Sequence, residues 1–411
     1  MVDVDLYDPA TQEDWFPTYQ VLRDEAPVYR VPGTGLYVLT RYEDVLWVLR
    51  HQDLFPTGGS TTRHRRAAEV YEQRGWARLT PLSVNPPEHR WYRSLVDGSF
   101  NGDGAERWRP EIDTVVTELI DDFADVGRVE LVGQFAMPLP VRMITRILGF
   151  PAEDIPRLKA WSEAWVLPFS GGLSEDQEVW VAEQVVEFQH YINDHIQQKR
   201  ADPGDDVLTG LTQARFNGER PLTDHEIITM VDHLYIGGNE TTTFAIASAM
   251  WLLLREPGLY ERIRADPELV PVFVEEAMRL ESPTQGLFRQ VATDVERHGV
   301  TIPAGSVVHI RYAAANRDER MFACPAEIDL ERSNGRRHMA FSLGEHSCPG
   351  SGLSRLEQRM ALEALLARLA NLRLADHNRF THHPGFVLRA LEHLHLEFDP
   401  ESDVESDPDP T

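Results

Sequence analysis

A cysteine at the start of a long predicted helix is the residue of this sequence whose type and position most clearly suggest reactivity. Cys348 is followed by Pro349, and an apolar pattern of helical period then runs over residues 349–370. Because proline favours the first helical turn, we expect Cys348 at the N-cap, where the helix dipole and free N–H groups lower the pKa of a thiol from about 8.5. A lone cysteine is more often a small buried apolar residue, so its neighbours must decide between the two roles.

A second stretch, residues 237–243 (Gly-Gly-Asn-Glu-Thr-Thr-Thr), lies in the middle of another long predicted helix. Thr223 and Glu226 form a capping box, and apolar residues recur up to Arg255, which predicts a helix of about 48 Å. Glycine and β-branched threonine are poor helix formers, and such local disagreement often marks a functional site. The alternative is a solvated polar patch whose threonines bond to helix carbonyls.

The elements that must position these two stretches are mostly helical. Helical patterns cover residues 11–25, most of 86–255, 258–281 and 349–370, while strand patterns cover 27–40, 285–311 and 386–398. This mixture predicts a mainly α-helical α+β fold with a small β-rich portion. A long loop with a short helix is expected over residues 54–85, and loops of that length are usually functional.

Both stretches resemble signatures of the cytochrome P450 family. The haem-binding signature F-x-x-G-x-H-x-C-x-G is matched by Phe341, Gly344, His346, Cys348 and Gly350. Ser342 stands where a glycine is common, and the central-helix pattern (A/G)-G-x-(D/E)-T matches residues 237–241. The resemblance covers about residues 10–398. It implies the cytochrome P450 fold, with the long helix over the haem and a single domain over residues 1–398.

The resemblance also implies the chemistry of the two stretches. It makes Cys348 the axial ligand of the iron in haem b, and a thiolate in this position favours cleavage of the O–O bond. Gly237 and Gly238 would leave a groove for dioxygen. Glu240 and Thr241 would form an acid–alcohol pair that delivers protons to bound oxygen in a pocket that otherwise excludes water.

Cationic residues for the haem follow from the same resemblance. Two haem propionates need cationic partners. The resemblance assigns this role to His89, Arg93, Arg289 and His338. Considered by itself, each of these residues would be interpreted as a surface charge. His346 would shape the loop before the ligand and would not bind the metal.

A further set of residues is expected to hold the fold beneath the haem. Glu276 and Arg279 form an E-x-x-R pair, which in isolation would be a surface salt bridge worth under about 1 kcal/mol. The resemblance implies instead a buried pair that is joined by Arg332 on the proximal side. Cys324 lies in a predicted loop and is expected to be structural.

The substrate pocket is expected over the haem face opposite Cys348. The resemblance assigns its walls to Leu79, Leu82, His233, Ile236, Gly237, Gln285, Leu287, Val387 and Leu388. Most of these side chains are apolar, which predicts a small apolar organic substrate. His233 could hydrogen-bond that substrate or a neighbouring helix, and the sequence leaves both open. Helices around residues 160–190 would form a lid.

The electron source is expected to be a separate protein, because no flavin or iron–sulfur motif is visible. The resemblance suggests a small ferredoxin that docks on a basic patch formed by Arg90, Arg355 and Arg359. Monooxygenation with dioxygen is therefore the leading interpretation. Peroxide-driven oxidation by the same haem and a non-catalytic haem sensor are the alternatives, and the acid–alcohol pair argues against both.

Composition narrows the class of protein further. The 411 residues carry a net charge of −26, which argues against nucleic acid and anionic membranes as partners. Two cysteines exclude a disulfide framework and fit a reducing cytoplasm, and neither a signal peptide nor a membrane anchor is visible. We expect a cytoplasmic monomer whose acidic, proline-rich tail over residues 399–411 is disordered.

Overall fold

The structure is a computed structural model that describes residues 2, 4–58, 64–77, 83–170 and 172–400. Two of the residues expected in the substrate pocket, Leu79 and Leu82, lie outside the described part. The same holds for the predicted tail apart from Asp399 and Pro400.

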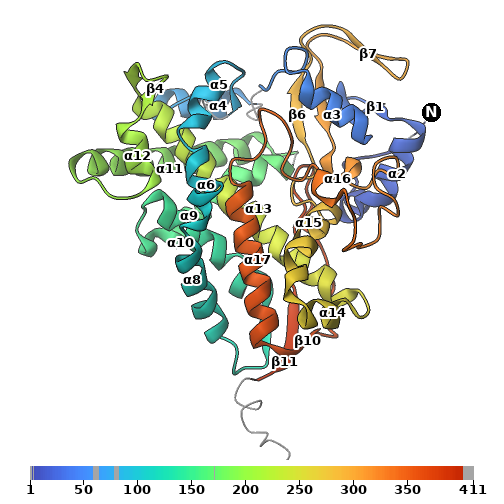
Figure 1. Cartoon of the computed structure of the whole chain (residues 1–411). Coiled ribbons are helices and arrows are strands. Elements are labelled where there is room, and N and C mark those ends of the chain that lie inside the picture. Colours follow the sequence, from blue (N-terminus) through green and yellow to red (C-terminus); the bar gives the residue numbers. More distant parts are fainter. Residues whose placement is uncertain (1, 3, 59–63, 78–82, 171, 401–411) are drawn as a thin grey trace, which may run out of the picture.

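Helices make up most of the described chain (Figure 1). The α-helices are α1 (Pro9–Glu13), α2 (Trp15–Glu25), α3 (Tyr42–Arg50), α4 (Arg65–Arg74), α5 (Glu88–Ser94), α6 (Asp97–Phe100), α7 (Asp103–Glu106), α8 (Arg109–Asp121), α9 (Pro138–Leu148), α10 (Ile155–Val166), α11 (Glu175–Ala201), α12 (Val207–Gln213), α13 (Asp224–Arg255), α14 (Leu259–Ala265), α15 (Val270–Leu280), α16 (Tyr312–Ala315) and α17 (Ser351–Arg368). Short 3-10 or π turns are η2 (Val132–Ala136), η3 (Ala152–Asp154), η4 (Leu167–Ser170), η5 (Pro267–Leu269) and η6 (Gly335–Arg337).

The strands are few and short, so the predicted mainly helical α+β class is confirmed. They are β1 (Val28–Arg30), β2 (Leu36–Leu39), β3 (Arg128–Glu130), β4 (Arg215–Phe216), β5 (Arg220–Pro221), β6 (Leu287–Gln290), β7 (Val295–Arg297), β8 (Val300–Ile302), β9 (Val307–Ile310), β10 (Ala370–Leu374) and β11 (His395–Asp399). The larger sheets have the strand orders β1-β2-β9-β6 and β10-β11-β3. In Figure 1 the four-stranded sheet lies to the right of the helical part.

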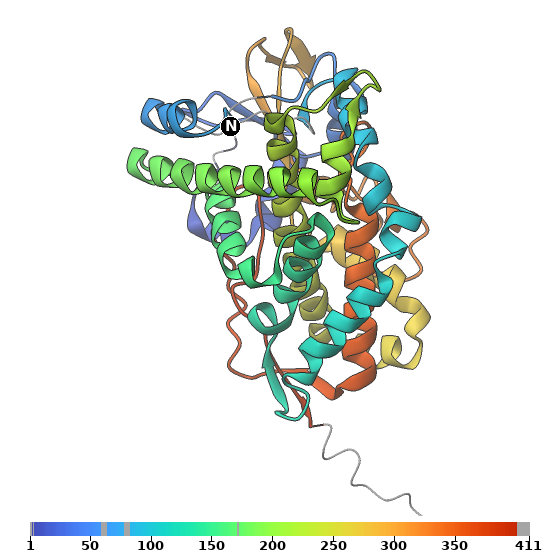
Figure 2. The same ribbon diagram turned by 90° about the vertical axis from the view of Figure 1, so that its left-hand side faces the viewer.

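Helix α13 crosses the middle of the molecule beside α17 (Figures 1 and 2). Its 32 residues are one continuous α-helix, as the sequence predicts. Thr223 Oγ1 accepts a hydrogen bond from the Glu226 N–H at 3.2 Å, and the Glu226 carboxylate accepts one from the Thr223 N–H at 2.8 Å. This capping box fixes the start of the helix. The helix ends before Glu256 because the residue that precedes a proline disfavours helical backbone.

The four-stranded sheet positions one edge of the cavity described below. Strand β9 runs parallel to β2 and antiparallel to β6, with Leu287 opposite Ile310 and Arg289 opposite Val308. Because alternate residues of a strand share a face, Leu287 and Arg289 point to the same side of β6. Both line the cavity.

Two local predictions are wrong. The strand predicted over residues 386–398 begins only at His395, and residues before it form bends with isolated bridges such as Thr284 to Leu388. Cys348 is not an N-cap, because α17 begins at Ser351 with Gly350 in the cap position. The thiol therefore lies in the loop before the helix, and the dipole argument for its pKa does not apply as predicted.

Candidate active site

A largely apolar cavity lies between α13 and the segment that carries Cys348. Helix α13 contributes Gly237, Thr241 and Thr242 to one wall, and Phe341 and Cys348 contribute to another. The hydroxyl of Thr242 donates to Ser354 Oγ on α17 at 3.0 Å, which ties the two walls together at one end of the cavity. The two stretches that the sequence singles out, residues 237–243 and the cysteine loop, therefore line the same cavity.

An irregular backbone carries Cys348 to the cavity. The Cys348 N–H donates to the Phe341 carbonyl at 2.9 Å, and the Ser347 N–H donates to the Gly344 carbonyl at 3.0 Å. Gly344 has φ +78° and Ser342 has φ +57°, so both adopt left-handed backbone. Burial raises the pKa of the Cys348 thiol, whereas a backbone hydrogen bond from Gly350 and the positive charges of nearby arginines lower it.

Ser342, the departure from the common glycine, occupies a position where glycine is the unstrained choice. Left-handed backbone costs a residue with a Cβ atom roughly 1–2 kcal/mol. The Tyr312 hydroxyl donates to Ser342 Oγ at 3.1 Å, and this hydrogen bond offsets part of the strain. Both residues line the cavity, and Tyr312 was not singled out by any sequence motif.

The two glycines of α13 have different surroundings. A Cβ atom on Gly237 would meet nothing within 4 Å, so this glycine leaves open space in the cavity. A Cβ atom on Gly238 would lie 2.8 Å from the Ile144 side chain, so this glycine allows α9 to pack closely against α13. Thr241 lies one turn after Gly237, and its hydroxyl donates to the Gly237 carbonyl at 3.0 Å.

Glu240 does not line the cavity but points towards α10. Its carboxylate accepts hydrogen bonds from Lys159 Nζ at 2.6 Å and from Ser162 Oγ at 3.1 Å. The Glu240 side chain is 7% exposed and that of Lys159 is 15% exposed. Lys159 also lies 3.6 Å from Glu163, which is exposed. A line of charged groups therefore leads from the surface to the residue next to Thr241.

Cationic and imidazole groups gather at the edge of the cavity that faces β6. Arg93, Arg289 and His346 line it. The Arg93 guanidinium is held by Asp97 at 2.7 Å and by the Ser347 carbonyl at 2.7 Å. Burial, followed by the nearby charges of His89 and Arg289, lowers the pKa of His346 to about 3. Among the described residues, the buried Nε2 atom of His346 has no hydrogen-bond partner.

These observations fit a porphyrin with two propionates. The Cys348 thiol lines the cavity. Arg93 at its edge pairs with Asp97, whereas Arg289 has no ion pair among the described residues. Arg289 and the unpartnered Nε2 atom of His346 therefore offer hydrogen-bonding groups for anions that the described chain does not itself provide. His89 is 1% exposed and lies behind this edge, with its ring centre 4.0 Å from that of His346. His346 thus lines the cavity together with Arg93 and Arg289, whereas the sequence analysis gave it only a role in the shape of the loop.

His338 is the propionate candidate that the structure places elsewhere. It does not line the cavity, and its Nε2 atom lies 2.9 Å from a carboxylate oxygen of Glu275. Its Nδ1 atom accepts the Ala340 N–H at 3.1 Å, so the ring is used on both sides. The role assigned to His338 is therefore wrong, because this imidazole is committed to a buried contact with α15.

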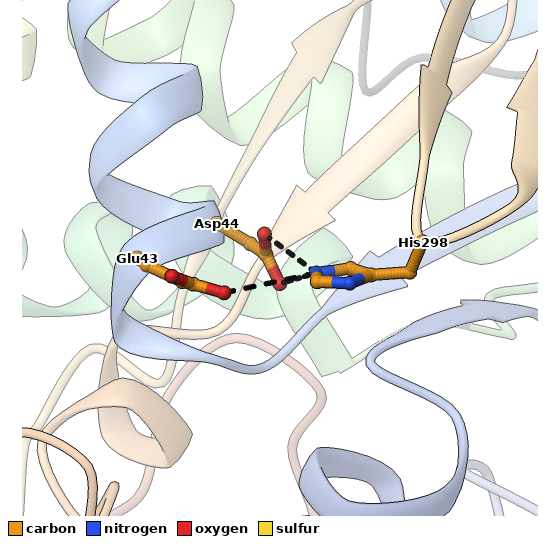
Figure 3. Close-up of side chains that lie close together, drawn as sticks. All are labelled: Glu43, Asp44 and His298. Atoms are coloured by element: carbon orange, nitrogen blue, oxygen red, sulfur yellow. Dashed lines mark hydrogen bonds and ion pairs between the residues drawn. The ribbon is translucent and has the colours of Figure 1, made fainter.

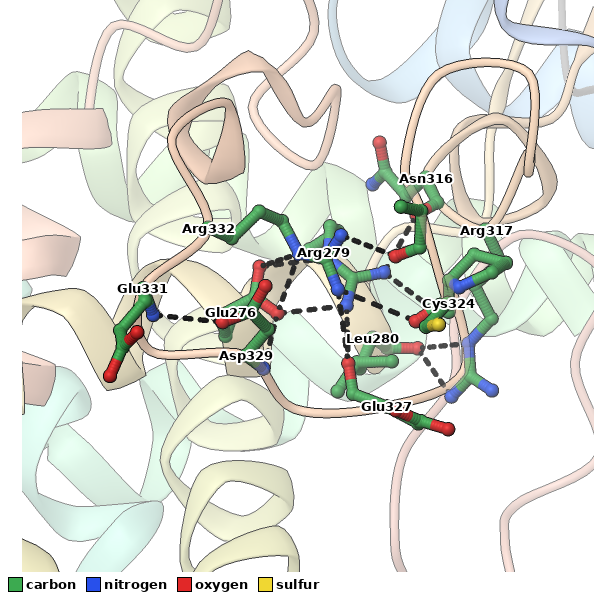
Figure 4. A network of polar contacts seen from close by, with 12 residues as sticks. Glu276, Arg279, Leu280, Asn316, Arg317, Cys324, Glu327, Asp329, Glu331 and Arg332 are labelled. Carbon is green, nitrogen blue, oxygen red and sulfur yellow. Dashed lines mark hydrogen bonds and ion pairs between the residues drawn. The ribbon is translucent and has the colours of Figure 1, made fainter.

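The E-x-x-R pair forms the buried network that the resemblance implies (Figure 4). Arg279 donates to both Glu276 oxygens at 2.9 Å, and Arg332 Nε lies 3.1 Å from both of them. Arg279 also donates to the carbonyls of Asn316, Pro325 and Glu327. The network joins α15 to the irregular segment before the cysteine loop, and Glu276 and Arg279 are at most 1% exposed.

Several residues expected in the substrate pocket do not line it. Ile236, Gln285, Val387 and Leu388 are absent from its walls, whereas His233 and Leu287 are present. Gln285 is buried, and its amide oxygen accepts a hydrogen bond from the Tyr19 hydroxyl at 2.8 Å. Val387 packs in a separate apolar cluster with Trp15 and Phe386. Packing against the N-terminal helices, which leaves no local sequence motif, decides the positions of Gln285 and Val387, whereas Ile236 packs in the main helical core.

Glu357 is a cavity residue that the sequence analysis missed. It lies on α17, is 1% exposed, and its carboxyl group makes no hydrogen bond or ion pair with any described residue. Burial raises the pKa of Glu357 from 4.5 to about 8. The sequence carried a signal for this residue, because Glu357 lies four residues after Leu353 on the apolar face of the predicted helix. A carboxyl group on a buried face is rare.

A second cluster of potential metal ligands lies far along the chain from Cys348 (Figure 3). Glu43, Asp44 and His298 bring their ligand atoms close together. His298 Nε2 lies 2.9 Å from Asp44, and Arg297 Nε lies 2.5 Å from the same carboxylate. Arg297 already neutralises the buried Asp44. We therefore interpret the cluster as a structural ion pair that holds the β7–β8 hairpin against α3.

The cytochrome P450 family model matches residues 142–396, and the chain belongs to this family. It is 35% identical over 382 residues to cytochrome P450 107B1 of Saccharopolyspora erythraea, covering 91% of this chain and 92% of that protein. It is 37% identical over 362 residues to mycinamicin IV hydroxylase/epoxidase of Micromonospora griseorubida, covering 87% and 88% of the two chains. The structure of P450BioI in complex with a hexadec-9Z-enoic acid ligated acyl carrier protein is similar with a TM-score of 0.86, at 31% identity and 95% and 99% coverage.

Membership of the family establishes the fold, the haem cofactor and the class of reaction, which is monooxygenation. Enzymes of this class use dioxygen and electrons from a redox partner. Within the described residues, no helix combines the length and the apolar character that crossing a membrane requires.

Proposed function

We propose that this protein inserts one oxygen atom of dioxygen into a small apolar substrate and uses electrons from a ferredoxin-type donor. The second oxygen atom leaves as water, which requires two electrons and two protons. The observation that carries the proposal is the cavity itself, with Cys348 on one wall, Thr241 on the other and cations at its edge. When bound, the haem supplies the iron at which dioxygen is reduced.

Each wall of the cavity has its own role in this proposal. Cys348 would supply the thiolate that binds the iron, while Arg93, Arg289 and His346 would hold the propionates, with His89 packed behind them. Gly237 keeps space for dioxygen beside Thr241. Phe341, Gly344 and Gly350 shape the loop that presents the sulfur atom.

Proton delivery is assigned to Thr241 and Glu240. The Thr241 hydroxyl, which donates to the Gly237 carbonyl, would release that carbonyl and donate into the cavity. Glu240 would receive protons from the solvent side through Lys159 and pass them towards Thr241. The carboxylate has to rotate from Lys159 towards α13 for this transfer, which makes the Lys159–Glu240 contact a control point.

The test compares two threonines that make the same local hydrogen bond. Thr241 donates to Gly237 and Thr243 donates to Asn239, both at 3.0 Å and both four residues back. We expect Thr241→Ala to lower the product formed per electron pair by about tenfold, with the lost electrons appearing as hydrogen peroxide. Thr243→Ala should keep the wild-type yield. Equal yields for the two variants would remove Thr241 from proton delivery.

The same assay separates the alternative functions. Turnover with hydrogen peroxide that exceeds turnover with a ferredoxin system would favour a peroxygenase. Absence of product with every electron source would favour a haem sensor. The intact Glu240–Thr241 pair supports the dioxygen-dependent reaction over both.

The substrate is expected to be mainly apolar, with one polar group near His233. Leu234, Met278 and Leu287 line the cavity together with His233, whose ring lies 5.9 Å from that of Trp165 on α10. We propose that His233 hydrogen-bonds a substrate carbonyl or hydroxyl. A substrate-induced spin-state titration tests this, because His233→Ala should weaken binding while Trp165→Phe should not. Unchanged affinity in His233→Ala contradicts the contact.

The expected docking patch needs revision because each of its arginines has an acidic neighbour. Arg90 lies against Glu345, Arg355 against Glu275 and Arg359 against Glu363. Arg336 lines a surface groove together with Arg355 and Arg359, and it has no ion pair among the described residues. We propose that the donor contacts this groove. Arg336→Glu combined with Arg359→Glu should slow reduction and leave substrate binding intact.

A further inference from the structure

Arg355 is more than a surface charge near the cysteine loop. Its Nε atom donates to Glu275 at 2.6 Å and its Nη2 atom donates to the other oxygen of Glu275 at 3.1 Å. The guanidinium carbon lies 4.3 Å from the ring centre of Phe341. A cation in this position is attracted by the negative face of the ring, so Arg355 is fixed on two sides.

Glu275 is itself held in place by a second partner, His338. Its carboxylate lies 2.9 Å from His338 Nε2, and it is 5% exposed. Burial would raise the pKa of Glu275, but hydrogen bonds from His338 and Arg355 lower it to about 2. The carboxylate is therefore charged at neutral pH and sets the position of the Arg355 guanidinium.

Phe341 connects this ion pair to the thiol. Its carbonyl accepts the Cys348 N–H at 2.9 Å, and both residues line the same wall of the cavity. Arg355 also donates to the carbonyl of Ser351, three residues after Cys348, at 3.3 Å. The positive charge is thus held against the ring of Phe341, the residue whose carbonyl bonds to the Cys348 N–H, and it is paired with the negative charge of Glu275.

We propose that Arg355 is a positioning residue whose charge, held by Glu275 on the face of Phe341, raises the reduction potential of the haem iron bound to Cys348. The proposal rests on the proposed function only in that Cys348 is the axial ligand. A nearby cation stabilises the state with one more electron, and outer groups tune a metal in this way. Removing the cation and removing the anion must then change the potential in opposite directions.

The experiment measures the reduction potential of purified holoenzyme by spectroelectrochemistry, without a redox partner or substrate. At a fixed solution potential, Arg355→Gln should lower the ferrous-to-ferric ratio about threefold, which is close to 30 mV for a one-electron couple. Glu275→Gln should raise the ratio. Arg355→Lys keeps the charge and should restore most of the wild-type value.

Arg359→Gln is the matched control, because Arg359 lies one turn further along α17 and pairs with Glu363. It should leave the potential unchanged. Shifts of the same sign in Arg355→Gln and Glu275→Gln, or no shift in either, overturn the proposal. If Glu275→Gln does not fold, the proposal is tested by comparing Arg355→Gln with Arg355→Lys. Equal reduction potentials in these two variants overturn the proposal. A wild-type carbon monoxide complex without the red-shifted band of thiolate ligation would instead refute Cys348 as the ligand.

Discussion

The two walls of the cavity are built by opposite means. The wall that carries Thr241 is part of a continuous helix, and the Thr241 hydroxyl donates to a carbonyl of that same helix. The wall that carries Cys348 is irregular, with left-handed backbone at Ser342 and Gly344. It is held by hydrogen bonds and ion pairs that come from other elements, above all α15 and α16.

The difference shows where each wall obtains its stability. A helix propagates its own geometry through local hydrogen bonds, so the wall on α13 needs outside support only where it packs. An irregular loop has no such ladder, and its backbone depends on side chains far away in the sequence. Substitutions of residues far away in the sequence should therefore disturb the wall that carries Cys348. Substitutions within α13 should disturb the wall that carries Thr241 to a smaller extent.

The largest expected effect comes from the ion network beneath the cysteine wall. Glu276→Gln leaves the buried Arg279 without its carboxylate partner, and breaking such a pair costs about 3–5 kcal/mol. Denaturant unfolding should show this loss. Glu331→Gln is the control, because its exposed contact with Arg262 at 3.5 Å is worth under about 1 kcal/mol. A loss below about 1 kcal/mol in Glu276→Gln would contradict the dependence of this wall on the network.

The next effect depends on pH and comes from Glu357 at the end of the cavity. Its pKa is raised to about 8 in the folded protein, so its contribution to stability is fully present below about pH 4.5 and is lost as the pH rises through 8. Glu357→Gln should match the wild type near pH 4 and exceed it by a few kcal/mol at pH 9. Glu363→Gln on the same helix should show no such trend. A difference that does not grow with pH argues against an unpaired carboxyl.

The wall on α13 can be tested with its two glycines. Gly237→Ala adds a methyl group into open space and improves helix propensity, so the protein without substrate should gain up to about 1 kcal/mol. Gly238→Ala forces the methyl group against Ile144 and should cost about 1–3 kcal/mol. Thermal unfolding of the two variants separates them, and similar effects would mean that α9 does not pack as described.

The smallest effect is expected at Ser342. Ser342→Gly relieves the left-handed strain but loses the hydrogen bond from Tyr312, so its net effect should stay within about 1 kcal/mol. Ser342→Ala loses the hydrogen bond and keeps the strain, and it should be less stable than Ser342→Gly by about 1–2 kcal/mol. The order of the two melting temperatures is the readout, and the reverse order would refute the strain.

The same division explains what the sequence could and could not predict. The span of α13 and its capping box follow from local patterns, and the cysteine loop follows from spaced residue types. Lys159 could not be found, because it lies 81 residues before Glu240 on another helix. His338 was assigned to the propionates because its partner Glu275, 63 residues away, carries no local signal.

The position of Gln285 and Val387 shows the same limit. Both lie at the start of segments predicted as strands, but the direction of their side chains depends on packing against the N-terminal helices. Long-range packing of this kind leaves no period or spacing in the chain.

The most direct test of the account concerns the sulfur atom of Cys348. Cys348→Ser replaces it with oxygen at nearly the same volume, and the absorption spectrum of the reduced carbon monoxide complex reports the axial ligand. The wild-type protein should show the red-shifted band of thiolate ligation, and the variant should lose it. A variant whose spectrum equals that of the wild type would contradict the assignment of Cys348 as the iron ligand.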